Sequence, residues 1–447
     1  MGAPEPLDPA FSQLAEAARS IGAQAWAVGG YVRDRLLGRE HREIDVVVED
    51  GKGPELAKRF AELTGSAPPV VFERFGTAQV MWRGRPIEFA SARAESYDPE
   101  SRKPTVRPAA IDDDLRRRDF TINALLMDFE GRVEDRLGTG LADLREGLLR
   151  TPLDPVATFK DDPLRMLRAI RFAAQLGFRL DPVQLPAMSS LADRLRPPVV
   201  SVERVKDELV KMLLSDRAKL ALELLDQGGL LPEVLPELAA CKGIAQGGYH
   251  HHDVFGHTLE TVDKTPPDRL TRLAALFHDV GKPTTAAPDG SFIGHEKVGA
   301  EMTTAAMTRL RFSNAEIERV ARLVLLHLRP VYYDPEWSDG AVRKLARDAG
   351  EDLGRLLDLA RADIGASDYD HPEKLEELAA RLKAVELERP SRFRSPISGE
   401  DIMRERALLP GPEVGRIKSR LDELVLEGAV EPSREAVLEY LRAHPEL

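Results

Sequence analysis

Residues 26–48 contain a glycine pair followed three residues later by an arginine, in an order that could bind a nucleoside triphosphate. Gly29 and Gly30 let backbone N–H groups approach a phosphate closely, because glycine has no side chain in the way. A helix expected to begin near Tyr31 would direct its positive N-terminal end to the same place, and Arg33 lies one turn into it as a charged donor. The glycine turn is therefore predicted to hold the phosphates.

Two carboxylates follow this turn at the start of a predicted strand. Glu43 and Asp45 are two residues apart, within or beside the apolar run of residues 44–48. Side chains two apart leave the same face of a strand, so both could hold one or two Mg²⁺ ions, which would serve an in-line displacement at phosphorus. A glycine pair alone, or an acidic pair alone, would more often be an ordinary turn with surface carboxylates. Their combination predicts the site.

A third carboxylate is predicted in a series of strands over residues 69–93, which has a turn at residues 83–85. Glu88 lies between two apolar residues in the last of these strands. Acidic side chains rarely occupy such a run without a partner. Glu88 is therefore expected beside Glu43 and Asp45, and the alternative is a glutamate that faces outward from a half-exposed strand.

The order of residues 29–48 resembles the catalytic head of class II tRNA nucleotidyltransferases (CCA-adding enzymes) and bacterial poly(A) polymerases, within the DNA polymerase β-like superfamily. The matching pattern is a glycine pair, V-R-D, L-L-G, an acidic residue, and then D-V-V-V after one further residue. The family more often has Asp where this chain has Glu43. The resemblance implies nucleotidyl transfer with Mg²⁺ on Glu43 and Asp45, and with Glu88 assisting activation of the attacking hydroxyl.

Residues 114–124 resemble the second motif of that family, D-L-x-R-R-D-F-T-x-N-A. The resemblance implies that Asp119 accepts a hydrogen bond from the ribose 2′-OH of the incoming nucleotide, and that Arg118 and Asn123 bind the same nucleotide. Taken alone, Asp119 would more simply be a helix N-cap. Before this motif, residues 95–111 are rich in Pro, Ser and charge and are predicted to form a mobile loop, which could act as a lid.

Four charged residues recur every third position along a helix predicted to run from residue 159: Asp162, Arg165, Arg168 and Arg171. Residues three apart share a helical face, so this face would be polar and convergent. It resembles the family's base-reading motif E-D-x-x-R, with Asp161 in place of the Glu. The resemblance implies that these residues bind the nucleotide and that Asp162 and Arg165 read the base, whereas a solvated face is the alternative.

Seven of the ten histidines fall between His250 and His327. With two carboxylates, a set of possible ligands recurs on separate predicted helices: His257, His278, Asp279, His295, His327 and Asp363. Neutral imidazoles and carboxylates suit a divalent transition metal, and this is the pattern of an HD-domain phosphohydrolase. A capping box at residues 313–316 is predicted to open the helix that carries His327. Two alternatives stay open: Asp358 or Asp368 could replace Asp363, or the domain could be a helical body that binds tRNA without metal.

Length and composition limit the possibilities further. A chain of 447 residues suggests about three units, and no apolar run is long enough for a membrane span. The N-terminus lacks the features of a signal peptide, and the single cysteine, Cys241, excludes an intramolecular disulfide, so a cytoplasmic location is expected. A net charge of −12 argues against RNA binding by the whole surface. Local basic groups such as residues 116–118 would have to hold RNA.

We therefore predict an α+β protein: a polymerase β-like head with a small mixed sheet, an all-α neck, an HD-domain body and a helical tail. The expected boundaries are residues 1–150, 151–230, 231–372 and 373–447. The predicted activity is addition of C, C and A from CTP and ATP to tRNA 3′ ends. An enzyme adding only CC or only A, or a poly(A) polymerase, shares these motifs, although the family's CC-adding members tend to lack the loop at residues 95–111. The alternative from another class is a metal-dependent phosphohydrolase whose head only binds nucleotide.

Overall fold

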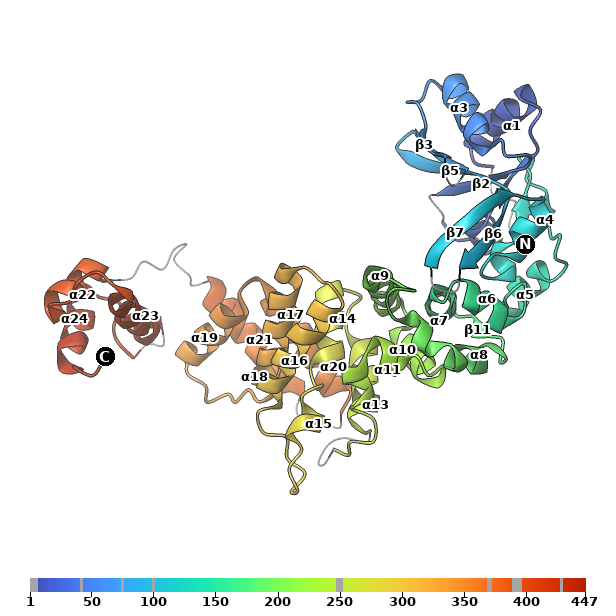
Figure 1. Cartoon of the computed structure of the whole chain (residues 1–447). Helices are drawn as coiled ribbons and strands as arrows, with labels where there is room; N and C mark the ends of the chain where they lie inside the picture. Colours follow the sequence, from blue (N-terminus) through green and yellow to red (C-terminus); the bar gives the residue numbers. More distant parts are fainter. Residues whose placement is uncertain are drawn as a thin grey trace. The chain divides into compact units, whose positions relative to one another are not determined.

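The computed structural model describes residues 7–40, 43–73, 76–98, 101–246, 252–367, 372–387, 396–426 and 429–447 (Figure 1). The chain forms two compact units, Met1–Pro236 and Glu237–Leu447. Within the described residues, no helix has the length and apolar character needed to cross a bilayer. The finer division into four domains stays a prediction.

A seven-stranded mixed sheet is the core of the N-terminal unit, with strand order β3-β4-β5-β2-β1-β8-β9. Strands β2 and β5 are parallel, and the other neighbouring pairs are antiparallel. This sheet and the helices around it confirm the predicted α+β class with a small mixed sheet. The strands are β1 (Ala25–Val28), β2 (Ile44–Val48), β3 (Val70–Phe72), β4 (Thr77–Trp82), β5 (Arg85–Ser91), β8 (Leu126–Met127) and β9 (Val133–Glu134).

The apolar run after the glycine turn forms β2 because its side chains can be buried on both faces of a central strand. Its four apolar residues are all buried, and only Asp45 interrupts the run. The predicted turn between β4 and β5 is confirmed: Arg83 and Gly84 have φ of 49° and 77°, which suits the tight turn of a β-hairpin. Helix α3 (Gly53–Thr64) packs against β4 and β5 through its apolar side.

The prediction of a loop at residues 95–111 is wrong. Strands β6 (Arg93–Asp98) and β7 (Ser101–Pro108) form an antiparallel hairpin apart from the large sheet, with a register irregularity between Ser96 and Asp98. Proline, serine and charge predict a loop from local composition, but strand formation depends on the pairing partner. Two such segments that pair with each other need no buried face from the main sheet.

The neck begins with two helices instead of the single one that was predicted. Helix α6 (Pro155–Asp161) ends before Asp162, and α7 (Leu164–Leu176) begins after Pro163. Proline lacks a backbone N–H and disfavours helical geometry in the residue before it. Asp162 accordingly has φ −138° and ψ 99°, so it does not lie on the same helix as Arg165. Helix α9 (Val202–Leu213) then packs against α7.

The second unit is helical throughout its described part. The helices that carry the predicted metal ligands, or end directly before them, are α13 (Val254–Lys264), α14 (Arg269–Phe277), α16 (His295–Arg309), α17 (Asn314–Leu326) and α20 (Leu353–Gly365). The predicted capping box is confirmed: the Ser313 side chain accepts from the Glu316 backbone, and the Glu316 side chain accepts from the Ser313 backbone. Helices α22 (Gly399–Arg406), α23 (Pro412–Leu426) and α24 (Arg434–Ala443) share a further apolar core.

Candidate active site

The sheet brings two of the three predicted head carboxylates together. Asp45 on β2 and Glu88 on the parallel strand β5 are direct register partners. Neighbouring residues at the same register of adjacent strands lie on one face of a sheet, so both carboxylates belong to the same surface. Glu43 is exposed and directly precedes β2. Glu88 is also exposed, and its Oε1 accepts a hydrogen bond from Gln79 Nε2 at 3.3 Å.

Gly29 lies directly beside the Asp45 carboxylate. Its φ is +74°, and a β-carbon there would approach Oδ2 of Asp45 to 3.2 Å and Nη1 of Arg118 to 3.5 Å. Both its backbone conformation and its surroundings therefore favour glycine. Gly30 follows as the first residue of α2 (Gly30–Leu36). The glycine turn, the Asp45 carboxylate and the Arg118 guanidinium thus meet at one place, whereas the sequence analysis expected the guanidinium of Arg33 at this turn.

Arg118 is held in this position by Asp114, a residue that the sequence analysis did not single out. Asp114 is 1% exposed, and its Oδ2 accepts from Nη2 of Arg118 at 3.1 Å. Its Oδ1 accepts from Nη2 of Arg117 at 2.6 Å and from the backbone N–H of Arg93, at the base of the hairpin. Burial alone would raise the pKa of Asp114, but the two arginines outweigh it and lower the pKa below its usual value.

Asp119 is buried in a network that joins the head to the neck. Its Oδ2 accepts from Nε of Arg168 at 2.9 Å and also from Nη2, while its Oδ1 accepts from Asn123 Nδ2 at 2.9 Å and from the Phe120 backbone N–H at 2.9 Å. Burial would raise the pKa of Asp119, but Arg168 and Asn123 hold it far below the usual value. A carboxylate accepts about four hydrogen bonds. Asp119 therefore has no acceptor position left, and any further donor would have to replace one of these four.

Arg33 belongs to the same network and does not point to the glycine turn as a free donor. Its Nε and Nη2 bind the two carboxylate oxygens of Asp34 at 2.8 and 2.9 Å, and its Nη1 donates to Oδ1 of Asn123 at 2.8 Å. Its guanidinium also lies 4.9 Å from the ring centre of Phe172. Arg33 can influence a nucleotide through Asn123, whose amide connects it to Asp119.

The side chains of the predicted base-reading pair have other partners, although the Arg165 backbone N–H donates to the Asp162 carbonyl at 3.0 Å. Asp162 receives Leu164 N–H on Oδ1 at 3.1 Å, and its Oδ2 lies 3.4 Å from Nη2 of Arg204 on α9. Arg165 is 8% exposed and donates to the backbone carbonyls of Thr158, at 3.3 Å, and Arg117, at 2.5 Å. The guanidinium next to the Asp162 carboxylate therefore belongs to Arg204 and not to Arg165.

Arg171 completes the row of arginines on α7. Its Nε lies 3.0 Å from Oε2 of Glu208, and both side chains are at most 10% exposed. Burial lowers the pKa of Arg171, although Glu208 opposes this effect. The guanidinium groups of Arg171 and Arg168 also lie 4.3 and 5.4 Å from the ring centre of Phe172. The row is therefore packed against other elements and is not a solvated face.

All four predicted histidine ligands of the second unit are buried and orient their rings alike. The Nδ1 atoms of His278, His295 and His327 lie 2.8, 2.8 and 2.6 Å from the carbonyls of Ala275, Phe292 and Val324. His257 Nδ1 is 3.4 Å from the Ala366 carbonyl. A proton on each Nδ1 leaves Nε2 free to bind metal, which is the usual arrangement of histidine ligands.

The carboxylate of Asp279 lies between two pairs of these histidines. Its Oδ2 is 3.2 Å from Nε2 of His278 and 3.7 Å from that of His257, and its Oδ1 is 3.4 Å from His295 and 3.9 Å from His327. Two groups of three possible ligands therefore share Asp279. The residue types and the common inward direction of Nε2 fit one or two transition-metal ions.

Asp363 and Lys282 complete this centre. Oδ1 of Asp363 is 2.9 Å from His257 Nε2, which supports the predicted choice of Asp363. Lys282, which the sequence analysis missed, donates to Oδ2 of Asp279 and to Gln246 at 2.6 Å each. Burial and His278 lower the pKa of His327 to about 3, so this ring is neutral and can bind a cation.

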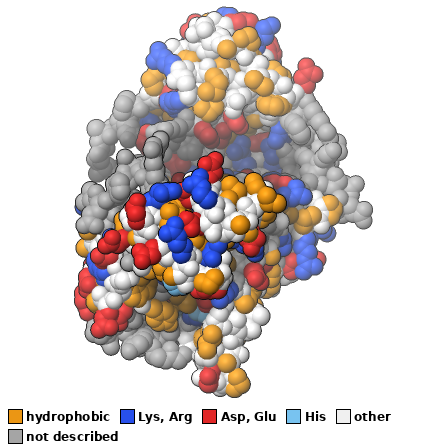
Figure 2. Space-filling view, turned by 90° about the vertical axis from the view of Figure 1, so that its left-hand side faces the viewer, with side chains coloured by type: hydrophobic (Ala, Val, Ile, Leu, Met, Phe, Trp, Pro, Cys, Tyr) orange, Lys and Arg blue, Asp and Glu red, His pale blue; other side chains and the backbone are white. Residues whose placement is uncertain are grey.

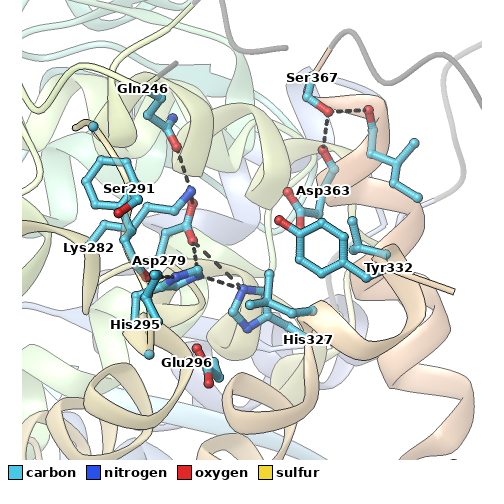
Figure 3. Close-up of a pocket in the computed structure, with 17 residues that line it drawn as sticks. Gln246, Asp279, Lys282, Ser291, His295, Glu296, His327, Tyr332, Asp363 and Ser367 are labelled. Carbon is cyan, nitrogen blue, oxygen red and sulfur yellow. Dashed lines mark hydrogen bonds and ion pairs between the residues drawn. The ribbon is translucent and has the colours of Figure 1, made fainter. Parts of the chain in front are cut away.

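A cavity of about 650 Å³ adjoins these ligands (Figure 3). Its lining includes four of the possible metal ligands and one lysine: Asp279, His295, His327, Asp363 and Lys282. Two large side chains at its edge are exposed: Ile293 is 89% and Tyr332 is 68% exposed. A polar centre with an apolar rim suits a small ester or nucleotide more than a macromolecule.

Three known domain families match successive parts of the chain. The Poly A polymerase head domain matches residues 25–150, the probable RNA and SrmB-binding site of polymerase A matches residues 177–242, and the HD domain matches residues 254–364. The first of these contains the glycine turn and the carboxylates. The third contains all six ligands of the second centre.

Two relatives match over nearly the whole chain. An A-adding tRNA nucleotidyltransferase of Deinococcus radiodurans is 36% identical over 427 residues, covering 92% of this chain and 93% of the relative. A CC-adding tRNA nucleotidyltransferase of Thermus thermophilus is 38% identical over 430 residues, covering 92% of each. Similar enzymes with different products are thus about equally close to this sequence.

Solved structures agree with this relationship. The CCA-adding enzyme of Bacillus stearothermophilus, solved with CTP, shares the fold with a TM-score of 0.69 at 24% identity, over 98% of both chains. A tRNA nucleotidyltransferase solved with a primer tRNA and an ATP analogue has a TM-score of 0.57 at 26% identity, covering 84% of this chain and 99% of that one. The motifs, the fold and relatives that span the chain establish that it is a nucleotidyltransferase of the class II tRNA nucleotidyltransferase and bacterial poly(A) polymerase family, with an HD domain.

Proposed function

We propose that this enzyme adds C, C and A from CTP and ATP to tRNA 3′ ends without a nucleic-acid template and releases pyrophosphate. The observation that carries the proposal is the pairing of Asp45 with Glu88 across β2 and β5, next to Gly29 and Arg118. This arrangement unites carboxylates for cations with a backbone turn and a guanidinium for phosphates.

In this reaction the tRNA 3′-OH attacks the α-phosphorus of the triphosphate, a new O3′–P bond forms, and the bond to the leaving pyrophosphate breaks. Glu43 and Asp45 would hold Mg²⁺, and Glu88 would help to orient and deprotonate the hydroxyl. Mg²⁺, when bound, supplies Lewis-acid stabilisation of the charge on both oxygens at phosphorus. Arg118, fixed by Asp114, would neutralise the triphosphate next to the glycine turn.

The incoming nucleotide would contact the network between head and neck. Asp119 would accept a hydrogen bond from the ribose 2′-OH in place of one of its four present hydrogen bonds. Asn123 binds both Asp119 and Arg33, so a shift of its amide would also move Arg33. Asp162 would accept the amino group that cytosine and adenine share. The guanidinium that faces the ring nitrogen would come from Arg165, as the motif suggests, or from Arg204, as the present ion pair suggests.

The segment at residues 95–111, which CC-adding members tend to lack, is present here as the β6–β7 hairpin, and this argues against a CC-adding enzyme. The test uses purified protein and tRNA primers that lack the last one, two or three nucleotides of CCA, each with CTP, ATP or both. A CCA-adding enzyme completes every primer when both triphosphates are present. A CC-adding enzyme would extend the shortest primer only by CC. An A-adding enzyme would extend only the primer that ends in CC, by one A, and a poly(A) polymerase would add a long A tail.

A second activity is supported by the HD centre. We infer that it is a metal-dependent phosphohydrolase site, because four buried histidines and Asp279 form two groups of possible metal ligands, and His295, His327, Asp279 and Asp363 also line the 650 Å³ cavity. His257, His278, Asp279 and Asp363 would hold one transition-metal ion, which supplies an activated water when bound. Lys282 would attract the anionic ester. Release of phosphate from generic phosphomonoesters, stimulated by Ni²⁺, Co²⁺, Mn²⁺ or Zn²⁺, tests this activity, and inactivity with all four would favour a helical body that only binds tRNA.

A further inference from the structure

A polar cavity of about 290 Å³ lies in the N-terminal unit, between the second motif and the start of the neck. Its lining contains three arginines and three threonines, together with Leu137, Pro152 and Leu153, and includes no carboxylate. The arginines and threonines are Arg116, Arg136, Arg150, Thr121, Thr139 and Thr151. None of these residues belongs to the carboxylate site or to the HD centre.

The three guanidinium groups are kept in place by acidic residues that do not line the cavity. Arg150 lies 3.2 Å from Asp181, and Arg136 lies 3.1 Å from Glu134 and stacks over Trp26 at 4.9 Å. Each guanidinium carries five N–H donors, so one or two contacts leave donors for a further ligand.

Arg116 is the least restrained of the three. Its guanidinium forms an ion pair with Asp113 at 3.5 Å, and both side chains are more than half exposed. An exposed ion pair of this length contributes little to stability. The Arg116 guanidinium can therefore turn to an anion in the cavity at small cost.

Two of the three threonine hydroxyls around the cavity donate to protein oxygens. Thr121 donates to Oδ2 of Asp143, and Thr151 donates to the Leu153 carbonyl, both at 2.6 Å. The donors that remain for a ligand thus come mainly from arginine. Planar guanidinium groups match the oxygens of a phosphate in bidentate geometry.

The cavity is also close in sequence and structure to the hydrogen-bond network of Asp119, Asn123 and Arg168. The short 3₁₀ helix η2 (Thr121–Asn123) contributes Thr121 to the cavity and Asn123 to the contact with Asp119. A phosphate in the cavity would therefore lie beside the short helix that also holds Asn123 against Asp119.

The charge of the molecule makes such a local site necessary. The net charge is −12, and on the face in Figure 2 the Lys and Arg side chains are interspersed with Asp and Glu. A surface of this kind does not attract RNA as a whole, so phosphate contacts must come from local arginine groups.

We propose that this cavity, which we call the three-arginine cavity, binds a phosphate group, and that its source is a backbone phosphate of the tRNA primer. The proposal rests on the proposed tRNA substrate. It adds an RNA contact in the head, outside the RNA-binding segment matched at residues 177–242. A free phosphate or pyrophosphate has the same chemistry and is the other possible source.

The test compares a double variant, Arg116→Gln with Arg150→Gln, with a control that loses the same charge, Arg19→Gln with Arg132→Gln. The control arginines are exposed and lie outside the cavity. Binding of tRNA is measured from low to moderate salt, and binding of inorganic phosphate and pyrophosphate is measured by calorimetry. We expect the cavity variant to bind tRNA about tenfold more weakly at low salt, with a slope of log K against log[salt] smaller by about 0.7–0.9, as for one lost phosphate contact.

The KM for CTP and ATP should stay unchanged in the cavity variant, and its thermal midpoint should match that of the control. Loss of phosphate or pyrophosphate binding with intact tRNA binding would keep the anion site but assign it to a free anion. Equal salt slopes and equal anion binding in both variants would overturn the proposal. Failure of the wild-type protein to extend tRNA would instead count against the proposed function, while the anion measurements still decide the site.

Discussion

At the scale of single residues, Asp45 carries the most weight because three parts of the head meet around its carboxylate. Its strand pairs with β1 on one side and β5 on the other, opposite Val28 and Glu88. Gly29 leaves just enough room for its Oδ2, and Nη1 of Arg118 lies close to the same β-carbon position. A larger residue at position 29 would displace the carboxylate and strain the turn.

We expect Asp45→Ala to reduce tRNA extension by at least about 10²-fold, because it removes a cation ligand at the developing charge. The fold should remain intact, since Asp45 is only half-buried and the core of β2 is apolar. Glu43→Asp should retain activity, and Glu49→Ala, at the other end of the strand, serves as the control. Primer extension and thermal unfolding measure both effects. Extension by Asp45→Ala at a rate close to wild type would show that the metal assignment is wrong.

Asp119 provides a test based on pH. Its folded-state pKa is depressed, so the stability that it contributes is complete above the unfolded-state pKa of about 3.9 and is lost as the pH falls toward the folded-state value. Asp119→Asn leaves Arg168 without its counter-charge. We expect the free energy of unfolding at pH 7 to fall by roughly 3 kcal/mol. This is the lower end of the range for breaking a buried ion pair, because Arg168 is about one-third exposed.

The difference in unfolding free energy between wild type and Asp119→Asn should therefore narrow when the pH is lowered from 7 to 3. Denaturant unfolding at both pH values measures it. The control is Asp128→Asn, which removes a carboxylate from a pair with the exposed Arg132 and should change stability little. A difference that stays constant with pH would mean that Asp119 is not held ionised by Arg168.

At the scale of elements, the break between α6 and α7 has the largest effect on the predicted site. Pro163 ends the helical path, and Asp162 turns to Arg204 instead of continuing the face of Arg165. The sequence contained this signal, because a proline after Asp162 disfavours helix at that position. The regular spacing of the charged residues suggested one face, and local backbone chemistry overrode it.

Base selection can be tested at this break. Cytosine and adenine each offer an amino donor beside a ring-nitrogen acceptor, whereas uracil and guanine present a carbonyl beside an N–H. A carboxylate with a neighbouring guanidinium matches the first two bases, and such a pair gives about 1–3 kcal/mol of discrimination. We expect Asp162→Ala to raise the use of UTP and GTP relative to CTP and ATP. Arg168→Ala should weaken the use of all four triphosphates alike, because its partner Asp119 is proposed to bind the ribose and not the base.

The kcat/KM values of the four triphosphates on tRNA primers decide which arginine cooperates with Asp162. Relaxed selectivity in Arg165→Ala would mean that Arg165 exchanges its carbonyl partners for the base. Relaxed selectivity in Arg204→Ala would favour the ion pair seen here. An unchanged base preference in both Asp162→Ala and Arg165→Ala would mean that the selecting edge lies elsewhere.

Other elements show what could be predicted from the sequence. The strands of residues 69–93, the glycine turn and the Ser313 cap depend on local patterns, and they were predicted correctly. The β6–β7 hairpin depends on pairing between two segments of weak strand character, so local composition predicted a loop. The roles of Asp114 and Lys282 depend on partners brought by folding: two arginines for Asp114, and Asp279 with Gln246 for Lys282.

At the scale of the whole molecule, the two candidate centres belong to different compact units. The carboxylate site lies within Met1–Pro236, and the HD centre lies within Glu237–Leu447. Their donor sets differ as well: carboxylates suit Mg²⁺ in the head, and imidazoles with carboxylates suit a transition metal in the HD centre. Each unit has its own core, so damage to one centre should leave the other intact.

We therefore predict that His278→Ala with Asp279→Ala removes transition metal and phosphohydrolase activity, while tRNA extension is largely kept. Because Asp279 is shared by both ligand groups, its loss should affect every ion in the centre.

His295→Ala with His327→Ala removes only one group and should keep the metal held by His257, His278 and Asp363. Elemental analysis after dialysis against Ni, Co, Mn or Zn measures this: if wild type holds two ions, the second variant should hold one and the first none. Equal metal content in wild type and His278→Ala with Asp279→Ala would contradict the HD assignment, whereas loss of tRNA extension with normal folding would show that the two centres depend on each other.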